Sequence, residues 1–221
     1  MAQTIGVLGL GIFGSTIAKE LGSHHHNVIA IDCNEENVNR IDPYISQGIV
    51  GDFTQYDLLK EVAIEQCDQV VIAAGSSLEA SVLAIMHLKE LGVKNITAKS
   101  KNHDYMRIMK ELGANRVIRP EYEMGLRVAR KIMKPRLIDI IDLDDKTSII
   151  EFKPPQEWVG RSLSDLKIRQ HFSLNVIGLK DSAKQKRTYQ VDPNEVINPN
   201  TVLIVIGDSS EIENFRLDWW L

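Results

Sequence analysis

Short apolar runs rich in β-branched residues alternate with stretches of helical periodicity over the first 120 residues. The runs that predict strands are residues 4–8, 27–31, 48–50, 69–74, 95–98 and 116–118, and the helical stretches are 13–21, 35–41, 56–63, 78–91 and 104–112. The predicted strands show no polar alternation, as expected when helices cover both faces of a parallel sheet. The pattern therefore predicts a compact α/β domain with a doubly wound parallel sheet.

The pattern changes after Pro120. A further helix is predicted over residues 121–133 and ends before Pro135, because proline fixes φ and lacks an N–H donor. Strands are then predicted at 137–143, 147–152, 175–179 and 201–206, and helices at 162–171 and from residue 211 onward. We therefore expect three parts: an α/β domain over 1–120, a crossover helix over 121–136, and a small α+β domain over 137–221. A domain of that size is near the low end of independent stability, which favours pairing of two copies through it.

A glycine loop, Gly-Leu-Gly-Ile-Phe-Gly over residues 9–14, directly follows the first predicted strand and opens the first predicted helix. In this context G-x-G-x-x-G predicts a Rossmann-type nucleotide site. Gly9 permits the tight turn, Gly11 lets the backbone approach the phosphates, and Gly14 lets the helix pack closely on the strand. The phosphates would then bind free N–H groups at the positive end of the helix dipole. The alternative is a glycine-rich turn in some other α/β fold.

Acidic residues end the second and third predicted strands. Asp32 comes 18 residues after Gly14, where a carboxylate accepts the hydroxyls of an adenosine ribose. A 2′-phosphate would meet like charge there, so we expect binding of NAD or of plain adenine nucleotides and rejection of NADP. Asp52 lies near the expected adenine, although a turn or helix N-cap acid is an equal alternative. The predicted cofactor-binding set also includes Ile12, Phe13, Phe53, Ala74 and Gly75.

Composition narrows the class of function. A net charge of −4 and a pI near 5.9 argue against nucleic-acid partners, and no recognition helix supports a DNA-binding redox sensor. No apolar run approaches the roughly 20 residues that cross a bilayer. The first residues carry neither a basic nor a hydrophobic targeting region, which predicts a cytoplasmic protein whose membrane role depends on a partner. Cys33 and Cys67 are expected to be reduced thiols.

No pattern in the chain supplies the proton donor or base that a hydride-transfer enzyme needs beside its nicotinamide. Tyr56 and Lys60 have the Tyr-x-x-x-Lys spacing of short-chain dehydrogenases, but they follow the third predicted strand, far too early in the chain. We therefore expect a binding protein rather than an enzyme. An NAD-dependent oxidoreductase with unrecognised catalytic residues is the alternative.

An ordered set of motifs resembles the TrkA/Ktr-type potassium-uptake regulators, which contain RCK (regulator of K⁺ conductance) domains. The motifs are residues 5–14, Asp32, Gly51-Asp52, 88–92, Gly113-Ala114 and 120–125, followed by 161–163, 166–169 and 175–177 in the part that resembles the family's C-terminal domain. The resemblance covers essentially the whole chain. It implies dimers that assemble into a cytosolic ring, typically of eight copies, docked on a TrkH/KtrB-type membrane subunit at the inner face of the membrane. ATP, ADP or NAD(H) would change the shape of this ring and thereby the ion flux.

The resemblance also implies roles for residues beyond the glycine loop. Glu121 would meet a divalent cation or a phosphate at the dimer interface, unless it is only a helix N-terminal acid. Lys99 would reach a terminal phosphate, unless it is a surface lysine. Many Ktr-type members carry arginine where this chain has Ile12, and isoleucine cannot neutralise a γ-phosphate. NAD(H) or ADP is therefore favoured over ATP.

For the C-terminal domain the resemblance implies a second ligand, cyclic di-AMP, bound across a two-fold axis. Ile168, Arg169 and Asn175 match that region, with Arg169 suited to a phosphate and Asn175 to hydrogen bonding. The alternative is that Arg169 is an exposed helix residue and Ile168 belongs to the core.

Overall fold

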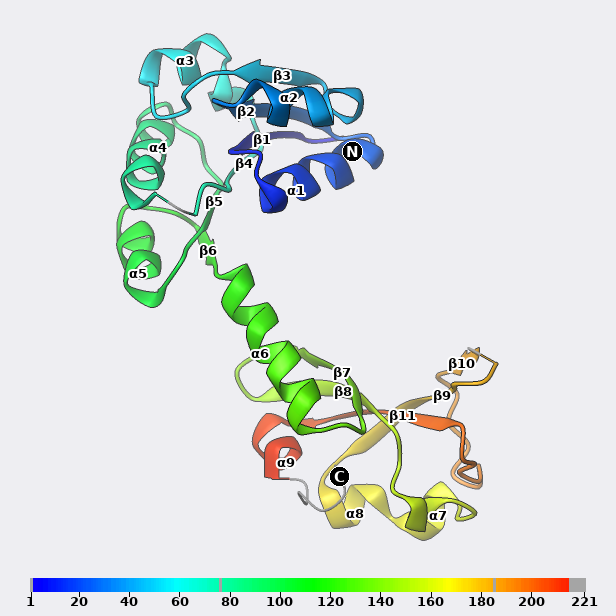
Figure 1. Ribbon diagram of the computed structural model, residues 1–221. Coiled ribbons are helices and arrows are strands. Elements are labelled where there is room, and N and C mark those ends of the chain that lie inside the picture. Colours follow the sequence, from blue (N-terminus) through cyan, green and yellow to red (C-terminus); the bar gives the residue numbers. More distant parts are fainter. Residues whose placement is uncertain (1, 76, 185, 215–221) are drawn as a thin grey trace. The chain divides into compact units, whose positions relative to one another are not determined.

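The computed structural model in Figure 1 describes residues 2–75, 77–184 and 186–214. The chain divides into two compact units, Met1–Tyr122 and Glu123–Leu221. The first unit contains a six-stranded sheet and the second a five-stranded sheet. This confirms the predicted α/β class with a small α+β domain after it.

The sheet of the N-terminal unit is parallel throughout, with the strand order β3-β2-β1-β4-β5-β6. Its strands are β1 (Thr4–Leu8), β2 (Asn27–Asp32), β3 (Gln47–Val50), β4 (Gln69–Ile72), β5 (Ile96–Lys99) and β6 (Arg116–Ile118). β1 lies between β2 and β4, so the direction of winding reverses beside it. In such sheets a crevice forms at the carboxyl ends of the two central strands, which is where ligands bind.

Helices cover both faces of this sheet, as predicted. They are α1 (Ile12–Ser23), α2 (Glu35–Ile41), α3 (Tyr56–Glu61), α4 (Leu78–Glu90) and α5 (His103–Glu111), with 3₁₀ turns at Asp42–Tyr44 and Ile64–Gln66. One buried apolar cluster joins Val7 to residues of α1 and α2, and another joins Leu8 to residues of α3, α4 and α5. Successive residues of β1 thus face opposite clusters. The predicted element ends differ from the observed ones by no more than two residues.

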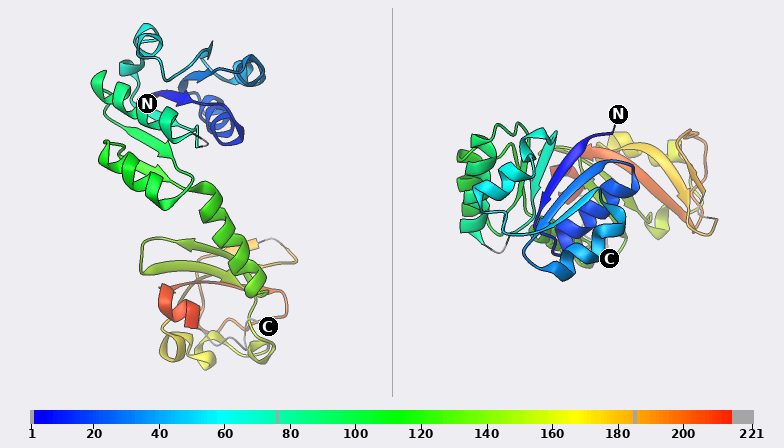
Figure 2. Two further views of the ribbon diagram at one scale, coloured as in Figure 1. Left: turned by 60° about the vertical axis from the view of Figure 1, so that its left-hand side comes forward. Right: turned by 90° about the horizontal axis from the view of Figure 1, so that it is seen from above.

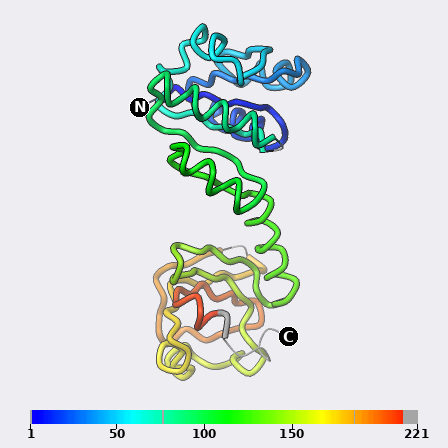
Figure 3. Tube along the Cα trace, turned by 90° about the vertical axis from the view of Figure 1, so that its left-hand side faces the viewer, coloured from blue at the N-terminus to red at the C-terminus, as the bar shows by residue number. Residues whose placement is uncertain are grey.

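A long helix, α6 (Pro120–Met133), follows β6 with only Arg119 between them, and Figure 3 shows the chain passing directly from the strand into the helix. Proline is well suited to this start because the first helical N–H has no intrahelical partner. The boundary between the two compact units falls inside α6, after Tyr122. The last turns of α6 lie along β7 (Leu137–Asp142), where Arg127 and Arg130 form ion pairs with Asp139 and Asp142 (Figure 2).

The sheet of the C-terminal unit is antiparallel, with the order β10-β9-β11-β8-β7. Its other elements are β8 (Thr147–Phe152), a 3₁₀ turn (Gln156–Trp158), α7 (Leu163–Leu166), α8 (Ile168–Phe172), β9 (Asn175–Asp181), β10 (Lys186–Thr188), β11 (Thr201–Asp208) and α9 (Ser209–Asn214). Phe152 and Trp158 pack edge to face, with ring centroids 6.2 Å apart, inside a separate buried apolar cluster. This unit therefore has a core of its own.

The C-terminal unit differs from the prediction in two places. The single helix expected over 162–171 is two short helices, because Lys167 adopts a left-handed conformation with φ of 46° and breaks it. Its start is the one the sequence indicates, since Ser162 and Asp165 form a capping box. The short edge strand β10 was not predicted. Among the described helices, none has the length and apolar character that crossing a membrane requires.

Candidate functional site

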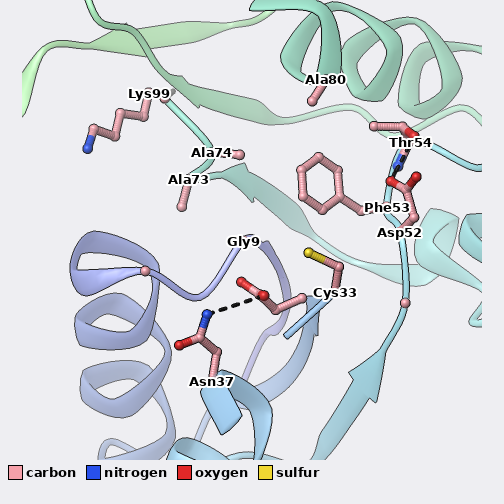
Figure 4. Close-up of a pocket in the computed structure, with 14 residues that line it drawn as sticks. Gly9, Cys33, Asn37, Asp52, Phe53, Thr54, Ala73, Ala74, Ala80 and Lys99 are labelled. Atoms are coloured by element: carbon pink, nitrogen blue, oxygen red, sulfur yellow. Dashed lines mark hydrogen bonds between the residues drawn. The ribbon is translucent and has the colours of Figure 1, made fainter. Parts of the chain in front are cut away.

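A cleft of about 600 Å³ opens at the carboxyl edge of the parallel sheet, entirely within the N-terminal unit (Figure 4). The predicted site residues that line it are Gly9, Gly11, Asp32, Asp52, Phe53, Ala74, Gly75 and Lys99. Gly51, Cys33, Asn37, Thr54, Ala73 and Ala80 also line it and were not predicted. Gly9 and Gly11 follow β1, and Ala73, Ala74 and Gly75 follow β4. The cleft therefore occupies the crevice that the strand order creates.

The three glycines of the loop differ in what they permit. Gly9 has φ of +90°, a conformation that glycine adopts without strain. A Cβ on Gly14 would lie 1.9 Å from the carbonyl oxygen of Gly9, so α1 approaches the loop more closely than any side chain allows. A Cβ on Gly11 would meet nothing within 4 Å. The fold therefore requires Gly9 and Gly14, whereas Gly11 keeps clear the space above the start of α1.

Among the described residues, no acceptor side chain caps the amino end of α1. Gly11 is its N-cap and provides no side-chain hydrogen bond, and its first turn contains no acidic residue. The first N–H groups of a helix lack intrahelical partners and carry partial positive charge. The sequence thus presents free donors to the cleft at the point where Gly11 leaves space for an anion.

Asp32 lies at the end of β2 with 9% of its surface exposed. Its Oδ2 accepts a hydrogen bond from the amide of Leu10 at 2.5 Å. Its Oδ1 accepts from the amide of Asn34 at 2.8 Å and from Nδ2 of Asn37 at 3.3 Å. The carboxylate therefore connects the glycine loop to α2 and borders the cleft at the place predicted for a ribose.

Asp52 is a turn acid that also lines the cleft. Its Oδ1 accepts from the amide of Thr54 at 2.9 Å and from the Thr54 hydroxyl at 2.7 Å, and these bonds lower the pKa of Asp52. Asp52 therefore stabilises a turn, which is one of the two roles considered from the sequence. Contact between Asp52 and an adenine base stays a prediction. The neighbouring Phe53 places its ring at the wall of the cleft, as Figure 4 shows.

Lys99 and Glu121 form an ion pair, with Lys99 Nζ 2.5 Å from Glu121 Oε1. The Lys99 side chain is 16% exposed and crosses Gly75, where a Cβ would lie 3.0 Å from its Cδ and Cε atoms. The hydrogen bond from Lys99 lowers the pKa of Glu121. The Lys99 ammonium also lies 5.6 Å from the centroid of the Phe13 ring. A cleft-lining cation is thereby tied to the first turn of α6.

Other predicted residues lie outside the lining of the cleft. Ile12 begins α1 and is 90% exposed, and Gly14 is buried beneath the loop. Glu121 is outside the lining of the cleft and contacts it through its bond to Lys99, and its role as a metal ligand stays a prediction. No group of three or more His, Cys, Asp or Glu side chains suited to a metal occurs in the described part of the chain. Tyr56 packs its ring edge against His87, with centroids 5.5 Å apart.

The two cysteines have different environments. Cys33 is exposed and lines the cleft, whereas Cys67 is buried in the N-terminal unit. Burial, with the nearby charge of Asp68, raises the pKa of the Cys67 thiol to about 11. Only Cys33 is therefore placed to meet a solvent-borne reagent.

The chain matches two family models, TrkA-N domain over residues 5–120 and TrkA-C domain over residues 148–217. It is 33% identical over 218 residues to Ktr system potassium uptake protein C of Bacillus subtilis, covering 98% of this chain and 97% of that protein. It is 32% identical over 208 residues to Ktr system potassium uptake protein A of Vibrio alginolyticus, covering 94% of each. This chain belongs to the TrkA/Ktr family.

Solved RCK structures share the fold of this TrkA/Ktr protein. The GsuK RCK domain matches 97% of this chain and 47% of its own, with a TM-score of 0.65 and 16% identity. The GsuK channel bound to NAD matches 96% of this chain and 38% of its own, with a TM-score of 0.64 and 17% identity. This chain therefore spans less than half the length of either structure, and at these identities the likeness shows the fold alone.

The three residues predicted to bind cyclic di-AMP differ in their exposure to solvent. Ile168 is 3% exposed and belongs to the core, while Arg169 and Asn175 are exposed. These environments agree with the alternative stated from the sequence, in which Arg169 is an exposed helix residue and Ile168 belongs to the core. A ligand role for the three residues stays a prediction.

Arg169→Ala tests that role. If Arg169 binds a phosphate of cyclic di-AMP, its loss is expected to weaken binding about tenfold or more, because a charge-assisted hydrogen bond disappears. Calorimetry on the full chain measures the affinity, and Gln170→Ala, an exposed change on the same helix, is the matched control. Equal affinity in Arg169→Ala and wild type would remove Arg169 from the site.

Proposed function

We propose that this TrkA/Ktr protein is the nucleotide-sensing regulatory subunit of a potassium uptake system and that its cleft binds NAD(H) or ADP. The observation that carries the proposal is the open amino end of α1 above Gly11, in the same cleft as the Asp32 carboxylate. The pyrophosphate would lie on the free amides and the adenosine ribose on Asp32. The potassium role is supported by relatives named as Ktr system potassium uptake proteins, which this chain matches along nearly their whole length.

The charges of the cleft favour a diphosphate. Ile12 supplies no cation beside the phosphate loop, and the ammonium of Lys99 is already paired with Glu121. A γ-phosphate would add negative charge with no further cation to neutralise it, whereas the pyrophosphate of ADP or NAD(H) lies on the helix amides within reach of Lys99. GsuK structures bound to NAD and to ADP are consistent with this ligand class; the ADP-bound one matches 62% of this chain with 15% identity and a TM-score of 0.50.

The acids and the lysine of the cleft are engaged in structural bonds. Asp32 has three donors, Asp52 is bonded to Thr54, and Lys99 is paired with Glu121. Such groups suit binding rather than proton transfer. We therefore infer a non-enzymatic role. Turnover of NADH with a small carbonyl substrate would favour the oxidoreductase alternative instead.

The Lys99–Glu121 pair provides a route from the cleft to the rest of the chain. Glu121 belongs to the first turn of α6, and only one residue separates α6 from β6. A phosphate that attracts Lys99 competes with Glu121 for the ammonium, so nucleotide occupancy would change how the start of α6 is held. Regulation by this route requires the nucleotide to bind two states of the protein with different affinities.

We propose that these states are two shapes of a ring of dimers, eight copies in all. The ring would dock on a TrkH/KtrB-type membrane subunit at the cytoplasmic face. Native mass spectrometry of the purified oligomer with its retained ligands tests stoichiometry and nucleotide identity together. Release of no adenine nucleotide from the protein purified from cells would count against the proposed ligand.

Nucleotide selectivity is the direct test of the cleft. Calorimetry with wild type is expected to show ADP and NADH binding at least as tightly as ATP, and NADPH binding at least tenfold more weakly than NADH, because its 2′-phosphate meets Asp32. Ile12→Arg is expected to raise affinity for ATP relative to ADP about tenfold. A wild-type preference for ATP over ADP of more than tenfold would contradict the inference from Ile12, and tight NADPH binding would contradict the role of Asp32.

A further inference from the structure

Two side chains of α2 that no motif singled out belong to the same network as Asp32. Asn37 and Arg40 are three residues apart and share a face of the helix. Arg40 Nη2 donates to the carbonyl oxygen of Leu10 at 2.9 Å and to Oδ1 of Asn37 at 3.1 Å. Asn37 lines the cleft and donates from Nδ2 to Asp32, the contact drawn as a dashed line in Figure 4.

The acceptor capacity of Asp32 limits what it can do for a sugar. Each oxygen of an ionised carboxylate accepts about two hydrogen bonds. Oδ1 already accepts from Asn34 and Asn37, so it is full, while Oδ2 accepts only from Leu10 among the described residues. Asp32 therefore has room for one ribose hydroxyl, whereas the ribose of an adenine nucleotide presents two.

The orientation of the Asn37 amide is fixed from both sides. Arg40 can only donate, so the atom facing it must be the Asn37 oxygen, and the Asp32 carboxylate can only accept, so the atom facing it must be the amide nitrogen. Nδ2 carries two N–H groups, and Asp32 uses one of them. Within the described part of the chain the other has no acceptor, and it belongs to a side chain that lines the cleft.

We propose that Asn37 is a second ribose-binding side chain. Its remaining N–H donates to one ribose hydroxyl, while Oδ2 of Asp32 accepts from the other. Arg40 is the positioning residue that holds the Asn37 amide in this orientation. The assignment rests on the proposed nucleotide cleft and deepens it: the preferred ligand is a ribonucleotide with both the 2′ and the 3′ hydroxyl free, and recognition of the pair is divided between β2 and α2.

Calorimetry of the full chain with ADP, 2′-deoxy-ADP and 3′-deoxy-ADP tests this division. Wild type is expected to bind each deoxy nucleotide about fivefold more weakly than ADP, the size of one hydrogen bond. Asn37→Ala is expected to bind ADP and one of the two deoxy nucleotides equally, while it still discriminates against the other. Arg40→Met is expected to reduce the same discrimination and to add nothing to Asn37→Ala when the two are combined.

Asn39→Ala, an exposed change on the same helix outside the lining of the cleft, is the matched control and should keep both discriminations. Thermal melting of each variant checks the fold, and Asn37→Ser serves if Asn37→Ala fails to fold. Full discrimination against both deoxy nucleotides in the Asn37 variants would overturn the assignment and leave the proposed nucleotide cleft standing. Failure of wild type to bind ADP or NADH would overturn both.

Discussion

Gly14→Ala is expected to destabilise the N-terminal unit by about 3 kcal/mol or more. The added Cβ would lie 1.9 Å from the carbonyl oxygen of Gly9 and 2.9 Å from the Cβ of Ala73, and neither atom is the end of a flexible side chain that could move aside. α1 must therefore move away from the loop, which disturbs the cleft and the apolar cluster beneath α1 and α2. Urea denaturation followed by circular dichroism measures the loss.

Gly11→Ala is the matched comparison. Its Cβ meets nothing within 4 Å and its backbone is extended, with φ of −60° and ψ of −170°, so stability should change by less than about 1 kcal/mol. Affinity for NADH or ADP should nevertheless fall tenfold or more, because the methyl group occupies the space above the helix amides. A stable Gly11→Ala protein with wild-type affinity would show that the phosphates do not approach this point.

Glu121→Gln is expected to abolish the response of potassium flux to nucleotide while the nucleotide still binds. The bond to Lys99 lowers the pKa of Glu121, so this carboxylate is charged at neutral pH, and glutamine removes that charge with little change of shape. Lys99 is then free for phosphate at all times, so affinity should equal or exceed that of wild type. Flux into vesicles that contain the membrane subunit, with and without ADP or NADH, measures the response.

The control for this experiment is Glu111→Gln, which removes one exposed carboxylate at the end of α5. It should leave both binding and the flux response unchanged. A Glu121→Gln protein that responds to nucleotide as wild type does would mean that the signal leaves the cleft by another route.

The N-terminal unit was predictable because its four central strands are buried on both faces over most of their length. Runs such as Val70, Val71 and Ile72 have no polar position to obscure them, and such runs are followed by helices of crossover length. The C-terminal unit gives weaker signals. Lys167 breaks a helix in a left-handed conformation that lysine rarely adopts, and β10 is a polar edge strand of three residues. Neither feature leaves a periodic trace in the sequence.

Some residues of the cleft can likewise be predicted from the sequence, and others cannot. Gly9, Gly11 and Asp32 have local spacings whose physical reasons can be stated from sequence alone. Lys99 and Glu121 are 22 residues apart, and their contact depends on how directly β6 passes into α6. Asn37 and Arg40 have the pattern of polar residues on a surface helix, and only the position of α2 beside the loop shows what they bond.

The placement of the two cysteines also has a practical consequence. A maleimide dye applied at neutral pH should attach to the thiol at the cleft and spare the one in the core, where a pKa of about 11 leaves almost no thiolate. The natural sequence thus carries its own labelling point beside the expected ribose. The occupancy of that site can be followed by fluorescence without adding or deleting a single residue.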